Sequence, residues 1–274
     1  MRILKPFLFA LAATSLWSCL PQKEVDLKIP PHDRKLTVEC FLEPGKPYRL
    51  VLTESVGFFD GPDTPFVDNA LVIISHNGTS DTLQNGFSFD LQDLKLYNYA
   101  STAVVPEDYN SEFTLYVRDP LGREIRGTTR MLQPVGFSSL VATFNEDSLA
   151  SATAQWPDTP GERNYYMFTL HRDSLNVGED SENGLQFSFT LDDRIGDGED
   201  FTISTFFNFE IGEKVICTVY KLSEAYWRYI ETANLSSDAN GNPFANPVTI
   251  FSTVEDGFGV FTGMNYVRDT LIIQ

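Results

Sequence analysis

Apolar and polar residues alternate in short segments along most of the chain, with the period of two that is typical of a half-buried β-strand. These segments are rich in Phe, Tyr and Val, and turn residues such as Pro44-Gly45 and Asn77-Gly78 separate them. The pattern therefore predicts a mainly β protein. The segments that we expect to form strands are residues 36–41, 48–53, 71–74, 79–83, 113–117, 124–129, 152–156, 165–170, 185–191, 201–207 and 214–220.

One stretch has helical spacing instead. Ser223 is a residue type that caps helices, and Tyr226, Tyr229, Ile230 and Ala233 then fall on one face. We expect a single amphipathic helix here, with its apolar stripe packed on the neighbouring sandwich.

The strand segments form two groups, and Gln133-Pro134 marks the boundary between them. The strand segments within residues 36–132 predict an N-terminal β-sandwich of the immunoglobulin or fibronectin type. Residues 136–274 predict a second, sandwich-like domain that contains the helix and ends in two strands around Asn265. The expected fold is therefore mainly β, with two β-sandwich domains and one amphipathic helix in the second.

The first 18 residues have the organisation of an export signal. Basic residues precede a short apolar run, residues 7–13, that is well below the roughly 20 residues needed to span a bilayer. The sequence Leu16-Trp17-Ser18-Cys19 then resembles the lipobox of bacterial lipoproteins. We expect residues 1–18 to be removed, Cys19 to carry the lipid and residues 19–35 to form a tether. A plain signal peptide with a chance cysteine is the alternative.

The charge of the chain limits its partners. Lys and Arg number 20 against 38 Asp and Glu, which gives a net charge of −18. Such a chain is repelled by nucleic acid and by anionic membrane surfaces, so we expect no nucleic-acid partner. No later apolar stretch is long enough to span a membrane, so lipid on Cys19 is the expected anchor of a soluble body.

One acidic, glycine-containing loop is a weak candidate for a metal site. Calcium takes six to eight oxygen ligands, and crowded carboxylates in a turn could supply them. The spacing of an EF-hand is absent, and Arg194 provides a local countercharge, so we favour a solvated turn between two strands. The candidate ligands are Asp192, Asp193, Asp197, Glu199 and Asp200.

No catalytic motif is recognisable in the sequence. It contains no Gly-x-Ser-x-Gly elbow and no Cys/His signature of a hydrolase. None of His32, His76 and His171 has a second ligand at zinc spacing. We therefore expect neither an enzyme nor a cofactor.

Two cysteines remain besides Cys19. Cys40 and Cys217 each lie on the apolar face of an alternating segment, so both are expected to be small buried residues. Because an exported protein meets oxidising conditions, a disulfide between them stays open as an alternative.

Several short motifs, taken in order, resemble the domain of unknown function 4249 family of lipoproteins from Bacteroidota. The motifs that carry the resemblance are the lipobox at Cys19, Leu36-Thr37-Val38-Glu39, Asn69-Ala70-Leu71-Val72-Ile73, Asn164-Tyr165-Tyr166, Ala225-Tyr226-Trp227, Asn242-Pro243-Phe244 and Gly257-Phe258-Gly259-Val260-Phe261. The resemblance implies an exported outer-membrane lipoprotein, on the cell surface in some cases, that is often encoded with TonB-dependent transporters. It brings no catalytic residues.

Two further sets of residues are candidates for modification or contact. Secreted proteins of this bacterial group can be O-glycosylated at Asp-Ser/Thr-apolar triplets, and Ser148 and Ser174 are the better placed, beside predicted strand ends. Aromatic residues in an irregular segment, residues 241–263, could contact a partner, or they could close the core of the second domain. The candidate contacts are Phe244, Phe251, Phe258 and Phe261.

These observations leave three hypotheses for function. The first is a non-enzymatic outer-membrane lipoprotein that is an accessory of a TonB-dependent transporter in nutrient uptake. The second is a surface adhesion or matrix-binding module, with calcium dependence as an option. The third and weakest is a hydrolase without a recognisable motif.

Overall fold

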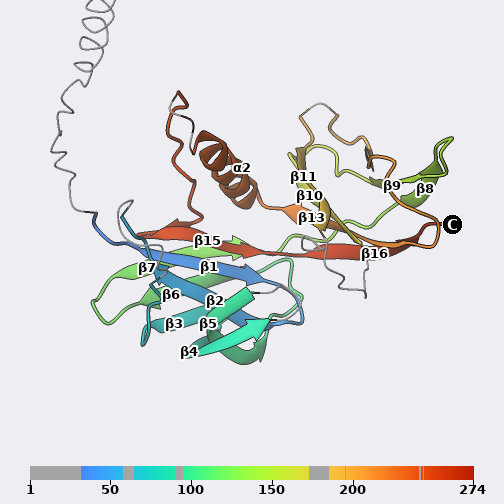
Figure 1. Ribbon diagram of the computed structural model, residues 1–274. Coiled ribbons are helices and arrows are strands. Elements are labelled where there is room, and N and C mark those ends of the chain that lie inside the picture. The colour runs from blue at the N-terminus through green and yellow to red at the C-terminus, as the bar shows by residue number, and fades with distance from the viewer. Residues whose placement is uncertain are drawn as a thin grey trace, which may run out of the picture. The chain divides into compact units, whose positions relative to one another are not determined.

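The computed structural model (Figure 1) describes residues 32–57, 65–90, 95–172, 185–194, 196–240, 242 and 244–274. Cys19, Ser174 and all but the last residues of the expected tether lie outside the described residues. Residues 34–274 form one compact unit. In the described part of this unit the structure is mainly β with a single helix, which confirms the predicted fold class. No described helix has both the length and the apolar character needed to span a bilayer.

Nine of the described strands form one sheet, which we call the first body. Their order is β14-β7-β6-β3-β4-β5-β2-β1-β15. The strands are β1 (Leu36–Leu42), β2 (Pro47–Glu54), β3 (Leu71–His76), β4 (Thr79–Asp90), β5 (Lys95–Val104), β6 (Glu112–Arg118), β7 (Glu124–Arg130), β14 (Val254–Glu255) and β15 (Phe258–Gly263). Neighbouring strands are antiparallel except β1 and β15, which are parallel and lie side by side in Figure 1.

The sheet of the first body nearly closes on itself. Its two edge strands, β14 and β15, are consecutive in the chain and are separated only by Asp256 and Gly257. The Gly263 N–H donates to Thr129 Oγ1 of β7 at 3.2 Å, across the remaining gap. Alternate residues of the strands point inward, and their side chains, with that of Phe261, fill a core of buried apolar groups.

A close backbone approach explains the glycine at position 259. Gly259 has a φ of +112°, and an added Cβ would lie 1.9 Å from the Val38 carbonyl oxygen of β1. Only a residue without a side chain can therefore pair β15 with β1 at this point.

A second body consists of two smaller sheets. One has the order β11-β10-β13-β16 and the other β12-β9-β8. The strands are β8 (Ser139–Phe144), β9 (Ala150–Trp156), β10 (Tyr165–Arg172), β11 (Leu185–Asp192), β12 (Phe201–Ser204), β13 (Lys214–Leu222) and β16 (Tyr266–Ile272). Side chains from both sheets share one core, in which Trp156 stacks on Phe168 at 5.7 Å between ring centroids. This arrangement is sandwich-like.

The boundary between the bodies differs from the one expected. The sequence pattern predicts that residues 254–263 belong to the second domain, whereas β14 and β15 pair with strands of the first body. The alternation of a strand is the same in either sheet, so the sequence pattern does not specify which sheet it joins. The chain then returns to the second body through Met264 and Asn265, and the Asn265 amide donates to the Leu132 carbonyl at 3.3 Å.

The helix α2 (Glu224–Ala239) lies where the two bodies meet. Its N-cap is Ser223, whose side chain accepts a hydrogen bond from the Tyr226 N–H, as the sequence predicts. The helix contacts β10 of the second body and β15 of the first. Tyr226 packs edge-on against Phe41 of β1, at 5.7 Å between ring centroids. The apolar stripe of the helix therefore covers the junction of the bodies and not one sandwich alone.

The two cysteines are not paired. Cys40 lies in the core of the first body and Cys217 in that of the second, and both are free thiols. Burial raises the pKa of each thiol to about 12. They behave as the small buried residues that the sequence predicts.

Candidate functional site

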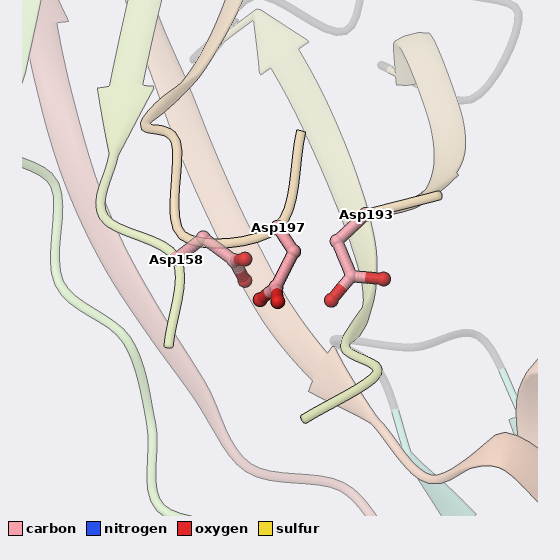
Figure 2. Close-up of side chains that lie close together, drawn as sticks. All are labelled: Asp158, Asp193 and Asp197. Carbon is pink, nitrogen blue, oxygen red and sulfur yellow. The ribbon is translucent and has the colours of Figure 1, made fainter. Parts of the chain in front are cut away.

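Three carboxylates gather between two loops at one end of the second body. Asp158 lies in the loop after β9, whereas Asp193 and Asp197 lie in the acidic loop after β11. Figure 2 shows the three side chains converging, and one oxygen from each lies within 4.8 Å of the others. Asp158 and Asp193 are buried and Asp197 is exposed.

Asp158 accepts hydrogen bonds from both of its sides. The Tyr166 hydroxyl donates to Asp158 Oδ1 at 2.8 Å, and the Gly198 N–H of the acidic loop donates to Asp158 Oδ2 at 2.9 Å. Burial, together with this bond to the carboxylate, raises the pKa of Tyr166 far above its usual range. Asp158 therefore holds the two loops together.

Asp193 and Asp197 of the acidic loop accept hydrogen bonds from the loop that follows β9. The Asn164 N–H donates to Asp193 Oδ2 at 2.8 Å, and the Gly161 N–H donates to Asp197 Oδ1 at 2.9 Å. None of the three carboxylates forms an ion pair with Lys or Arg in the described part of the chain. The cluster thus serves as a cross-link between the loops, and its remaining lone pairs are suited to a hard cation such as calcium.

The structure separates the other calcium candidates from this cluster. Asp192 Oδ2 forms an ion pair with Arg194 Nε at 2.6 Å, and Asp192 Oδ1 accepts from the Arg194 N–H at 3.2 Å. Although burial opposes the shift, these contacts with Arg194 lower the pKa of Asp192. Asp200 accepts from the Gln155 amide at 3.2 Å, and Glu199 is exposed. Of the five carboxylates predicted, only Asp193 and Asp197 come together. Asp158 was missed because it lies in a different loop, far from the acidic run in sequence.

A second candidate site is a cavity of about 220 Å³ where the chain passes from β15 to β16. Five aromatic rings line it, and they come from β1, β5, β13, α2 and β16: Phe41, Tyr97, Tyr220, Tyr226 and Tyr266. The rings of Tyr220 and Tyr266 are neighbours on paired strands, at 5.3 Å between centroids. We call this cavity the aromatic pocket.

Three cations also line the aromatic pocket, and two of them are paired with carboxylates. Lys46 Nζ lies 2.7 Å from Glu43, which also lines the pocket. Lys95 Nζ lies 2.6 Å from Glu39 and 4.7 Å from the centre of the Phe41 ring. These two pairs are local to the first body.

The third cation is Arg268, and its contacts differ. Its Nε donates to Thr218 Oγ1 at 3.1 Å, and its guanidinium lies 5.0 Å from the centre of the Tyr266 ring. It forms no ion pair with any carboxylate of the described residues. Burial raises the pKa of the nearby Tyr220 phenol, and Arg268 opposes that rise.

No local pattern in the sequence points to the aromatic pocket. Tyr226 was predicted only as part of the apolar stripe of the helix, and the other four rings lie on strands far apart in the chain. Only the return of β15 to the first body brings them together. The wall that results can stack against a ring and can attract an anion.

The predicted partner contacts have different environments. Phe244 is 95% exposed and Phe258 is 40% exposed. Phe251 lies against the helix, where the Arg228 guanidinium is 4.2 Å from its ring centre. Phe261 is 1% exposed in the core of the first body, so its assignment as a partner contact is corrected. The alternative of a core role applies to Phe261, although the core is that of the first body and not of the second.

Ser148, the predicted glycosylation site within the described residues, lies on an exposed turn. Its φ is +61°, and its N–H donates to the Asn145 carbonyl at 3.2 Å. The hydroxyl is on the surface, so modification there stays a prediction that the geometry permits.

Comparisons with known proteins identify the family. Among solved structures, the chain is similar to the crystal structure of chicken CNTN1 FN1-FN3 domains, at 10% sequence identity and a TM-score of 0.27, over 68% of this chain and 60% of that chain. It thus spans about 60% of the length of that structure. No curated protein matches the sequence. The profile of the family described as a domain of unknown function, DUF4249, matches residues 22–270, and the chain therefore belongs to that family.

Proposed function

We propose that this chain is an exported outer-membrane lipoprotein, anchored through Cys19, that acts without catalysis as an accessory of a TonB-dependent transporter in nutrient uptake. The observation that carries the proposal is the aromatic pocket. Its described lining offers ring faces, phenol hydroxyls and a cation without a carboxylate partner, and it includes no Ser, Cys or His. Such a wall is suited to holding a small ligand.

The lipid and the tether supply the other half of the proposal. A binding body held on the membrane surface keeps its ligand at a high local concentration near any transporter in the same membrane. Phe244, which follows the helix in the chain and is 95% exposed, is a surface aromatic of the kind found at interface cores. It is the first residue at which to seek contact with a transporter.

Crosslinking in the native outer membrane tests the partnership. A photo-crosslinker placed at residue 244 is expected to capture a TonB-dependent transporter, and the same group at Ser148, an exposed position on a turn between β8 and β9, is the matched control. Deletion of the chain is expected to reduce uptake of the ligand, and Cys19→Ala to reduce it through loss of the anchor. Recovery of the free monomer alone, with normal uptake after deletion, contradicts the proposal.

A second candidate function is a surface adhesion or matrix-binding module that depends on calcium. The observation that favours it is the convergence of Asp158, Asp193 and Asp197 within 4.8 Å. Under this hypothesis, calcium raises the Tm of the protein, magnesium does so less, and Asp197→Asn removes the calcium effect. An unchanged Tm in calcium and in chelator excludes it, and Asp200→Asn is the control outside the cluster.

A further inference from the structure

We infer that the aromatic pocket binds a ring that carries a single carboxylate, with the carboxylate on Arg268 and the ring against the aromatic wall. The ring belongs either to an aromatic acid or to a uronic acid, because both share this chemistry. The inference rests on the proposed binding role but not on the partnership with a transporter.

The first argument comes from charge. The chain as a whole carries a net charge of −18, so an anion is repelled from most of its surface. The aromatic pocket is an exception, because three cations line it against one carboxylate, Glu43. Lys46 and Lys95 are already paired with glutamates, which leaves Arg268 as the cation available to a ligand.

The second argument comes from the orientation of Arg268. It is directly opposite Thr218 on β13, and the Thr218 hydroxyl accepts from Nε at 3.1 Å. This bond occupies Nε, so the Nη groups remain to donate to an incoming anion beside the hydrogen bond that Arg268 makes with Tyr220. Two parallel N–H groups are the geometry that binds a carboxylate with both of its oxygens.

The third argument comes from size and from the walls. A cavity of about 220 Å³ is smaller than most sites for drug-sized ligands, which begin near 300 Å³. It has room for one six-membered ring with a carboxylate. The rings of Tyr220, Tyr226 and Tyr266 line the cavity. Aromatic rings stack on a flat ring or on the apolar face of a sugar.

The charges of the pocket lining favour a ligand with one negative charge over a ligand with two. One cation is available, and the carboxylates of Glu43 and Glu39 lie beside the two lysines. A phosphate dianion would be repelled by these glutamates without a second available cation to offset the repulsion. The inference is therefore specific for a carboxylate.

Titration calorimetry of the full lipoprotein in detergent tests the inference with five probes. Benzoate and glucuronate represent the two sources of the carboxylate, benzyl alcohol and glucose are the neutral controls, and phenyl phosphate is the dianion. We expect saturable binding of at least one acid and binding at least tenfold weaker for its neutral control, because the neutral molecule cannot form charge-assisted hydrogen bonds with Arg268. Whichever acid binds more tightly identifies the source.

Variants of Arg268 locate the binding. Arg268→Gln is expected to weaken binding of the acid at least tenfold, Arg268→Lys to weaken it less, and neither to change the neutral control. Arg118→Gln, which removes an exposed arginine of β6 outside the pocket, should leave the affinity unchanged. The Tm of each variant shows that it is folded.

Three outcomes would overturn the inference. The first is that neither acid binds at concentrations up to about 10 mM. The second is an equal loss of affinity in Arg268→Gln and Arg118→Gln. The third is tighter binding of phenyl phosphate than of benzoate. Failure of the transporter partnership is distinguishable from these. Calorimetry needs no transporter, so acid binding without a crosslinked transporter supports the pocket and counts only against the accessory role.

Discussion

The first body and the second body bury one face of their sheets in different ways. The first body curls nine strands until β14 and β15 almost close the sheet. The second body stacks two small sheets, which leaves β8, β11, β12 and β16 as edges. Its core is built around stacked rings at Trp156, whereas the core of the first is mainly aliphatic.

Neither body is a continuous piece of chain. The first body needs β14 and β15, which follow nearly the whole of the second. The second needs β16, which follows the closing strand of the first. The described strands thus pass between the bodies three times. Because the strands of each body are separated in the chain by strands of the other, we expect the two bodies to fold and unfold as one unit.

The most severe test separates the bodies by truncation. A chain that ends at residue 132 retains β1 to β7 but lacks β14, β15 and the buried Phe261. Because loss of one buried Phe side chain alone costs about 3–5 kcal/mol, we expect this fragment not to fold. Circular dichroism and amide exchange measure the result. A cooperative thermal transition of the fragment would show that the first body is an independent domain.

A milder test uses one glycine from each body. Gly259→Ala places a Cβ against the Val38 carbonyl and imposes a positive φ on alanine, so we expect a loss of about 3 kcal/mol or more of unfolding free energy. Gly212→Ala is the matched control in the second body, with a φ of +95° and no atom within 4 Å of the added Cβ. Its expected loss is about 1 kcal/mol. Equal losses in denaturant titrations would mean that β15 does not approach β1 so closely.

The smallest perturbation uses the thiols, since each body holds one. With their pKa raised to about 12, Cys40 and Cys217 should react with iodoacetamide at pH 8 on the order of a thousandfold more slowly than an exposed thiol. In rising denaturant both should become reactive at the same midpoint, because the bodies unfold together. Mass spectrometry of the two labelled peptides distinguishes them. Separate midpoints would contradict the coupling of the bodies.

The local parts of this fold could be predicted from the sequence, and the long-range parts could not. The strands near residues 36–41 and 165–170 and the cap at Ser223 follow from the alternation and the residue types within a few positions. The place of β15 beside β1 does not, because the same alternating pattern fits any sheet with one buried face.

The candidate sites follow the same division. Asp193 and Asp197 belong to one acidic loop and were found, whereas Asp158 in another loop was not. The aromatic pocket was not predicted at all, since Phe41, Tyr220 and Tyr266 meet only after the chain has crossed between the bodies. Pairing of strands distant in sequence is thus the information that the sequence pattern lacks.

The parallel pairing of β1 with β15 has a mechanical consequence. Any pull transmitted through the residues that precede Leu36 acts first on β1, which lies between β2 and β15. When the pull is directed along β1, the hydrogen bonds on both of its sides are loaded in shear and must break together, not one after another. The strand nearest the expected anchor is therefore held by hydrogen bonds to β2 on one side and to β15 on the other. This arrangement resists a force that is applied through the expected tether.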